Sequence, residues 1–221
     1  MVEKYTRGAT ARDNLHDLDI CTYAFDLDMT LVDSRPGVVA SFAALTAETG
    51  VYVDGELVCS RLGPKLEDEL ANWFPPERIE AAAAAYRRHY DRECRTGTIA
   101  LPGALALVEA VHERDGRAGV VTAKSTVSAH ICLETVGLVC DEVAGWCFGA
   151  EKTTALRRMN ADLYVGDTIT DIAAGRAAPG VATVGVTTGP DDRDSLLAAG
   201  ADIVISDLTE GVDAFAHLGR W

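Results

Sequence analysis

Apolar and polar residues follow two different rhythms along this chain. Short apolar runs typical of buried strands are found at 20–27 and then, after Leu101, in RAGVVT, DEVAG, ADLYVGD, VATVGV and ADIVIS. Segments with helical spacing separate the later runs, at 104–113, 125–135, 153–159, 169–178 and 195–199. Strands that alternate with helices predict a Rossmann-like, doubly wound α/β core with a parallel sheet.

Residues 35–97 have a purely helical rhythm. A first helix is expected from Pro36 to Gly50, and a second begins near Lys65 and includes Trp73. A third carries its larger side chains at spacings of four, three and four, namely Ile79, Ala83, Tyr86 and Tyr90. We therefore expect a discontinuous α/β core (20–34 and 98–221), an inserted all-helical domain (35–97) and a flexible N-terminal tail (1–19).

Composition narrows the class of protein. The formal net charge of −14 would repel a polyanion, so we expect no nucleic-acid partner. No apolar run reaches the ~18 residues of a membrane span, and no secretory signal pattern opens the chain, so we expect a cytoplasmic protein without a membrane partner. The six cysteines form no C-x-x-C pair, so we interpret them as reduced, mostly buried thiols.

Polar residues end several of the predicted strands, where ligands bind in open α/β sheets. Asp26 and Asp28 follow the first strand in FDLDMTLVDS, although a strand-end turn also uses aspartates to cap backbone N–H groups. Thr122 in GVVTAKS precedes a helix, where it suits an anion site or an ordinary N-cap. Lys152 in GAEKTTAL would, by itself, be a solvated surface lysine.

A further strand, in LYVGDTITDI, ends at Asp167, with Asp171 four residues later. Asp167 alone could be a helix N-cap. Together with the earlier pair, however, these residues would gather four carboxylates at one sheet edge. Each like-charge pair would cost on the order of 4 kcal/mol at ~4 Å and an effective dielectric of ~20. A divalent cation removes that cost, and a set of oxygen ligands selects a hard one such as Mg²⁺.

The ordered set DLDMT, VVTAK, the lysine of GAEK and VGDTITD resembles the four motifs of the haloacid dehalogenase superfamily, across most of 20–215. The resemblance implies a Mg²⁺-dependent phosphatase that forms an aspartyl-phosphate. It makes Asp26 the nucleophile and Asp28 the general acid and then base. An acid at Asp28 favours phosphoryl transfer over removal of halide or cleavage of a carbon–phosphorus bond. Met29 stands where most relatives have Gly, which alters the turn but removes no reacting group.

The resemblance also assigns the supporting residues. Thr122 and the Ala123 N–H would hold phosphoryl oxygens, and Lys152 would neutralise the nucleophile and the phosphate. Asp167 would ligate Mg²⁺ together with the Asp26 carboxylate and the Asp28 backbone carbonyl, with Asp171 as an outer or alternative metal contact.

The insertion resembles the helical cap of phosphoglycolate-phosphatase-like members, which closes over a small substrate. Arg35, Arg61 and Lys65 are candidates to meet an anionic substrate group, or are ordinary solvated cations. Tyr86 and Tyr90 are expected to pack inside the cap. The predicted substrate is a small phosphorylated metabolite, such as phosphoglycolate, a sugar phosphate or a nucleotide. A phosphomutase and a non-catalytic binding protein are the alternatives, and the oligomeric state stays open.

Overall fold

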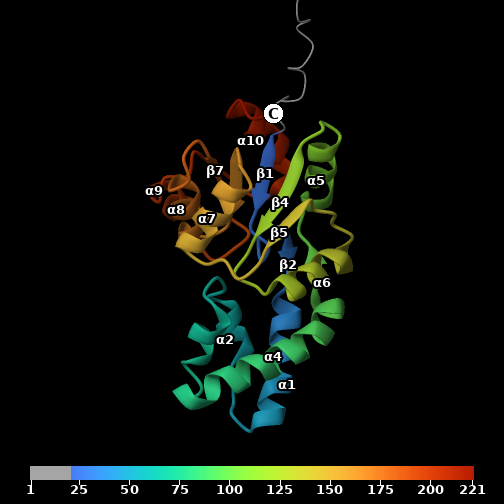
Figure 1. The fold of residues 1–221 in the computed structure, drawn as a ribbon, viewed down its shortest axis with the longest axis vertical. Coiled ribbons are helices and arrows are strands. Elements are labelled where there is room, and N and C mark those ends of the chain that lie inside the picture. The colour runs from blue at the N-terminus through green and yellow to red at the C-terminus, as the bar shows by residue number, and fades with distance from the viewer. Residues whose placement is uncertain (1–20) are drawn as a thin grey trace, which may run out of the picture.

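The computed structural model describes residues 21–221, and its central element is a six-stranded parallel sheet (Figure 1). The strand order is β5-β4-β1-β6-β7-β8, and every neighbouring pair is parallel. The strands are β1 (Thr22–Phe25), β4 (Arg117–Val121), β5 (Glu142–Ala144), β6 (Leu163–Gly166), β7 (Ala182–Val186) and β8 (Ile203–Ile205). The predicted parallel α/β sheet is confirmed.

Helices cover both faces of this sheet, as the alternating side chains of β1 require. Phe25 points to a face covered by α5 (Ala104–His112), α6 (Thr126–Val136) and α10 (Gly211–His217). Ala24 points to the opposite face, where it packs with Leu156 of α7 (Ala150–Arg158). Two further helices, α8 (Ile169–Arg176) and α9 (Arg193–Ala198), pack beside β6 to β8, on the left in Figure 1.

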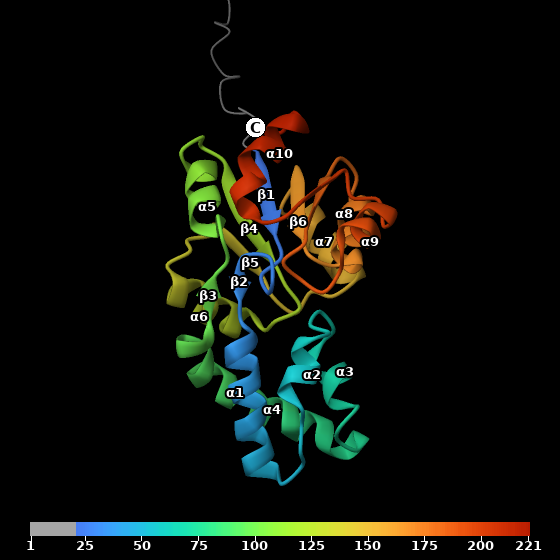
Figure 2. The same ribbon diagram turned by 180° about the vertical axis from the view of Figure 1, so that it is seen from behind.

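The helical insertion, residues 35–97, lies beyond one end of the sheet (Figure 2). It contains α1 (Arg35–Thr49), α2 (Gly55–Cys59), α3 (Leu66–Leu70) and α4 (Pro76–Gly97). An antiparallel pair, β2 (Val32–Asp33) and β3 (Ile99–Ala100), flanks it on the chain. The helices α1 and α4 approach closely at this junction, because a Cβ on Gly97 would lie 2.3 Å from the backbone nitrogen of Gly37.

Several predicted elements differ from the structure in their length. The helix near Lys65 is only five residues long and leaves Trp73 outside it. The helix expected from residue 153 begins at Ala150, which places Lys152 in its first turn. Helices α2 and α10 were not predicted. The division into a core and an inserted domain stays a prediction, and the predicted tail, 1–19, lies outside the described residues.

Two smaller expectations concern thiols and membranes. All six cysteines are free, but only Cys94 and Cys132 are buried, so the expectation of mostly buried thiols was wrong. The other four lie in partly exposed loops and element ends. Within residues 21–221, no helix has the length and apolar character that a membrane crossing requires.

Candidate active site

Asp26 lies immediately after β1, at the centre of the sheet and at the end that faces the helical insertion. Its backbone N–H donates to the Val165 carbonyl at 2.8 Å, which continues the pairing of β1 with β6 beyond the strand. Its side chain is buried, and Lys152 Nζ donates to its Oδ1 at 2.8 Å. The local sheet register therefore aims this carboxylate at the ammonium group of α7.

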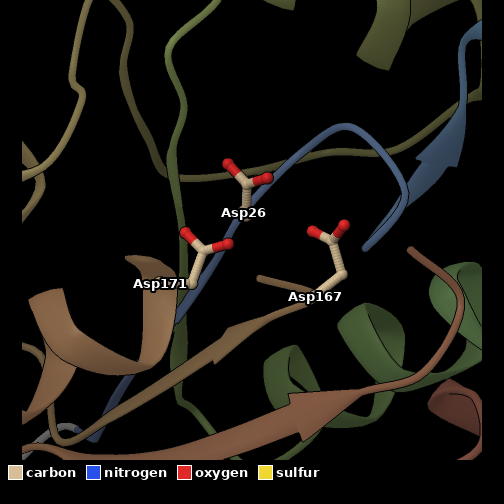
Figure 3. Close-up of side chains that lie close together, drawn as sticks. All are labelled: Asp26, Asp167 and Asp171. Carbon is tan, nitrogen blue, oxygen red and sulfur yellow. The ribbon is translucent and has the colours of Figure 1, made fainter. Parts of the chain in front are cut away.

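Asp26, Asp167 and Asp171 form a buried acidic cluster (Figure 3). Each offers a carboxylate oxygen within 4.8 Å of the other two. Burial raises the pKa of Asp26 to about 7, a rise that Lys152 opposes and Asp171 increases. Burial and the two neighbouring carboxylates also raise the pKa of Asp167 well above its ordinary value. Without a cation, the folded protein thus disfavours full ionisation of the cluster.

Asp171 differs from the other two aspartates because both of its carboxylate oxygens accept hydrogen bonds from protein side chains. Its Oδ1 accepts from Lys152 Nζ at 2.6 Å and from the Tyr164 hydroxyl at 2.8 Å. Its Oδ2 accepts from Thr168 in a capping box at the start of α8. Burial alone would raise the pKa of Asp171, but these donors lower it. Asp171 is therefore an ionised anchor for Lys152 and for the start of α8.

The cluster fits a hard divalent cation. Its donors are carboxylate oxygens, which Mg²⁺ prefers, and Asp26 and Asp167 retain oxygens that are not tied up by a helix cap. Asp167 Oδ1 accepts a hydrogen bond from Thr30 Oγ1 at 3.1 Å. A cation held here would remove the cost that burial now places on the charges of Asp26 and Asp167.

Asp28 and Lys124 form a second charged group beside the cluster. Lys124 Nζ lies 3.2 Å from Asp28 Oδ1, and the Ser34 hydroxyl donates to the same oxygen. Lys124 also donates its backbone N–H to Thr122 Oγ1 at 3.2 Å, which holds the loop after β4. The side chain of Asp28 is about one fifth exposed and lines a cavity.

The cavity has a volume of about 120 Å³ and lies between the sheet end and the helical insertion. Its core side is lined by Asp26, Asp28, Thr122, Ala123, Lys124, Lys152, Asp167 and Asp171, so every predicted catalytic, phosphate-binding and metal-binding residue reaches it. Its other side is lined by residues of the insertion, including Arg61, Glu69, Tyr86, Arg87 and Tyr90.

The three cations suggested for substrate contact are arranged differently. Arg61 lines the cavity, but its guanidinium makes two hydrogen bonds to Glu69, at 2.9 and 2.6 Å. Arg35 pairs with neighbouring Asp33, and Lys65 pairs with Glu151 of α7. Neither Arg35 nor Lys65 is among the described residues that line the cavity.

Comparison with known proteins identifies the family. The sequence profile of haloacid dehalogenase-like hydrolases matches residues 23–176, which contain all four motifs. The chain belongs to this family.

Several curated relatives of this hydrolase are named as phosphatases. A phosphoglycolate phosphatase of Rhodospirillum rubrum is 32% identical, over 89% of this chain and 88% of the relative. An N-acetylmuramic acid 6-phosphate phosphatase of Pseudomonas putida is 29% identical, over 82% of this chain and 89% of the relative. A solved haloacid dehalogenase-like hydrolase from Streptococcus pneumoniae superposes with a TM-score of 0.76, at 24% identity, over 89% and 98% of the two chains. The predicted phosphatase class is confirmed.

Sequence reasoning missed two side chains that line this hydrolase's cavity, Lys124 and Tyr90, and one buried behind it, Tyr164. Lys124 stands two residues after Thr122 in the quoted VVTAK motif but received no role. Tyr90 was assigned to packing alone, whereas its hydroxyl accepts from Lys124 Nζ at 2.8 Å. Tyr164 carries no sequence signal for its contact with Asp171, since an apolar strand commonly includes a tyrosine.

Proposed function

We propose that this protein hydrolyses a small phosphate monoester, with Asp26 as the nucleophile. The observation that carries the proposal is a buried carboxylate with a raised pKa that faces a lysine, two further aspartates and a cavity. Asp28, on the same loop, lines the cavity beside it. This arrangement supports a nucleophile and a separate proton donor acting on one substrate.

The first step transfers the phosphoryl group to the protein. An oxygen of Asp26 forms a bond to phosphorus as the bond from phosphorus to the leaving oxygen breaks, and Asp28 donates a proton to that oxygen. In the second step, Asp28 takes a proton from water, the water oxygen bonds to phosphorus, and the Asp26–phosphorus bond breaks to release phosphate. Lys152 stabilises the carboxylate and the phosphoryl oxygens throughout.

The remaining residues would bind the phosphoryl group, hold the metal ion or cover the site. Thr122 Oγ1 and the Ala123 N–H would donate to phosphoryl oxygens. Mg²⁺ held by Asp26, Asp167 and the Asp28 backbone carbonyl would neutralise the phosphoryl charge, with Asp171 as an outer contact. We also propose that residues 35–97 act as a cap over a core of 20–34 and 98–221. That cap would confine substrates to small phosphorylated metabolites, such as phosphoglycolate, a sugar phosphate or a nucleotide.

Phosphate release from the purified protein tests this proposal. With Mg²⁺, a panel of small phosphate esters should include substrates whose turnover excess chelator abolishes and added Mg²⁺ restores. Asp26→Asn should remove turnover because an amide cannot form the acyl-phosphate. Asp213→Asn, which removes an exposed carboxylate of α10, is the matched control and should keep wild-type rates. Wild-type phosphate release by Asp26→Asn would refute the mechanism.

A further inference from the structure

The Lys124 ammonium is held between the proposed acid and the helical insertion. Its side chain is 12% exposed, and Nζ lies 3.2 Å from Asp28 Oδ1 and 2.8 Å from the Tyr90 hydroxyl. Nζ also lies 4.0 Å from the centroid of the Tyr90 ring. Burial alone would lower the pKa of Lys124, but the Asp28 carboxylate raises it above its ordinary value. The lysine therefore stays charged where it touches both neighbours.

Tyr90 belongs to α4, in the helical insertion, but its hydroxyl contacts the core. The side chain is buried, its ring stacks on Tyr86, and its hydroxyl lies 3.3 Å from the Cys132 sulfur of α6. These contacts fix the ring between α4 and α6. The hydroxyl can therefore meet Lys124 only while α4 is seated against the core.

The two oxygens of Asp28 are used unequally. Oδ1 receives both the Ser34 hydroxyl and the Lys124 ammonium. Within residues 21–221, no hydrogen bond reaches Oδ2. Because Oδ1 is occupied by two donors, the proton that Asp28 gives to a leaving group is best carried on Oδ2. Because both oxygens belong to one planar carboxylate, fixing Oδ1 also fixes the position of Oδ2 on this cavity-lining residue.

We propose that Lys124 and Tyr90 are positioning residues for the acid Asp28: Tyr90 holds Lys124, and Lys124 holds Oδ1 so that Oδ2 presents its proton to the leaving oxygen. This inference rests on the proposed function, in which Asp28 protonates the leaving group. It makes proton donation depend on the seating of α4, because the Tyr90 hydroxyl comes from the insertion. Substrate enclosure and acid alignment then occur together.

Leaving-group dependence separates this role from a purely structural one. An alkyl phosphate needs a proton on its leaving oxygen, whereas an aryl phosphate with an acidic phenol, such as p-nitrophenyl phosphate, does not. Rapid-quench measurement of phosphate transferred to Asp26 reports the first step alone. Tyr90→Phe and Lys124→Met should slow transfer from the alkyl ester by about 10- to 100-fold, but from the aryl ester by about threefold or less.

Tyr23→Phe is the matched control, since it removes a buried tyrosine hydroxyl that donates to the Arg220 carbonyl, away from the cavity. It should leave the alkyl-to-aryl ratio unchanged. If thermal melting shows that Lys124→Met does not fold, the alkyl-to-aryl ratio of the milder variant Tyr90→Phe tests the inference by itself. Equal slowing with both esters, or a change in KM alone, overturns the inference. Absence of covalent phosphate on wild-type Asp26 would instead contradict the proposed function.

Discussion

Ionisation of Asp26 should destabilise the metal-free protein. Burial raises the pKa of this carboxyl from 3.8 to about 7 in the folded state, whereas the unfolded chain has the ordinary value. Because the folded pKa is raised, protonated Asp26 contributes stability at low pH, and that contribution is lost as the pH rises through about 7. Replacing the carboxyl by an uncharged amide should remove this pH dependence.

The pKa difference sets the size of the effect. At roughly 1.4 kcal/mol per pKa unit, the raised pKa of Asp26 lowers the free energy of unfolding by about 2 kcal/mol near pH ~5 and by about 4 kcal/mol near pH ~8. In Asp26→Asn, Lys152 keeps its 2.6 Å contact with Asp171, so the lysine is not left unpaired. Between these two pH values, the wild-type protein should therefore lose on the order of 2 kcal/mol more unfolding free energy than Asp26→Asn loses.

Urea unfolding in excess chelator measures this difference. Midpoints and slopes for wild type, Asp26→Asn and the control Asp213→Asn would be compared at the two pH values. Added Mg²⁺ should then stabilise wild type more than Asp26→Asn, because the amide is a poorer ligand for a hard cation. If wild type and Asp26→Asn lose equal unfolding free energy between the two pH values, burial does not penalise the Asp26 charge and the reasoning is wrong.

Two other substitutions test the loops around the cluster. Met29 has a left-handed backbone, with φ of 59°, but its side chain is buried. Met29→Gly should relieve about 1 kcal/mol of strain and lose about 2–5 kcal/mol of packing, so urea unfolding should show net destabilisation. Gly189→Ala would place its Cβ 1.8 Å from Asp167 Oδ2, so it should displace that carboxylate and weaken Mg²⁺ binding, measured by calorimetry. Unchanged metal affinity in Gly189→Ala would contradict the proposed ligand.

The sheet and the residues at its edge could be predicted because their signals are local. An apolar run that is followed by Asp26, Thr122 or Asp167 indicates both a strand and the position at which that strand ends. Because the strands are parallel, these ends meet at one edge of the sheet. The register was not predicted: the structure pairs Phe25 with Val120 on one side and Val165 on the other, and neither partner can be read from the apolar runs alone.

Burial of the lysines could not be predicted in the same way. Taken alone, Lys152 was expected to be solvated, and only the family resemblance placed it at the site; in the structure α7 begins early enough to turn it toward Asp26 and Asp171. Lys124 is buried by Tyr90, which lies 34 residues away in sequence and in another part of the fold. The five-residue helix α2 has a clear N-cap at Asp54 but is too short for apolar periodicity to reveal.

The two buried lysines divide the carboxylates of the site into paired and unpaired groups. Lys152 forms ion pairs with Asp26 and Asp171, and Lys124 forms an ion pair with Asp28. Among the residues that the structure describes, Asp167 forms no ion pair, and its pKa is raised well above the ordinary value. Asp167 therefore gains most from a divalent cation, so we expect it to govern metal affinity more strongly than Asp171, whose charge is already neutralised. In a chain with a net charge of −14, we expect that cation and the two lysines to make the core side of the cavity attractive to an anionic ester.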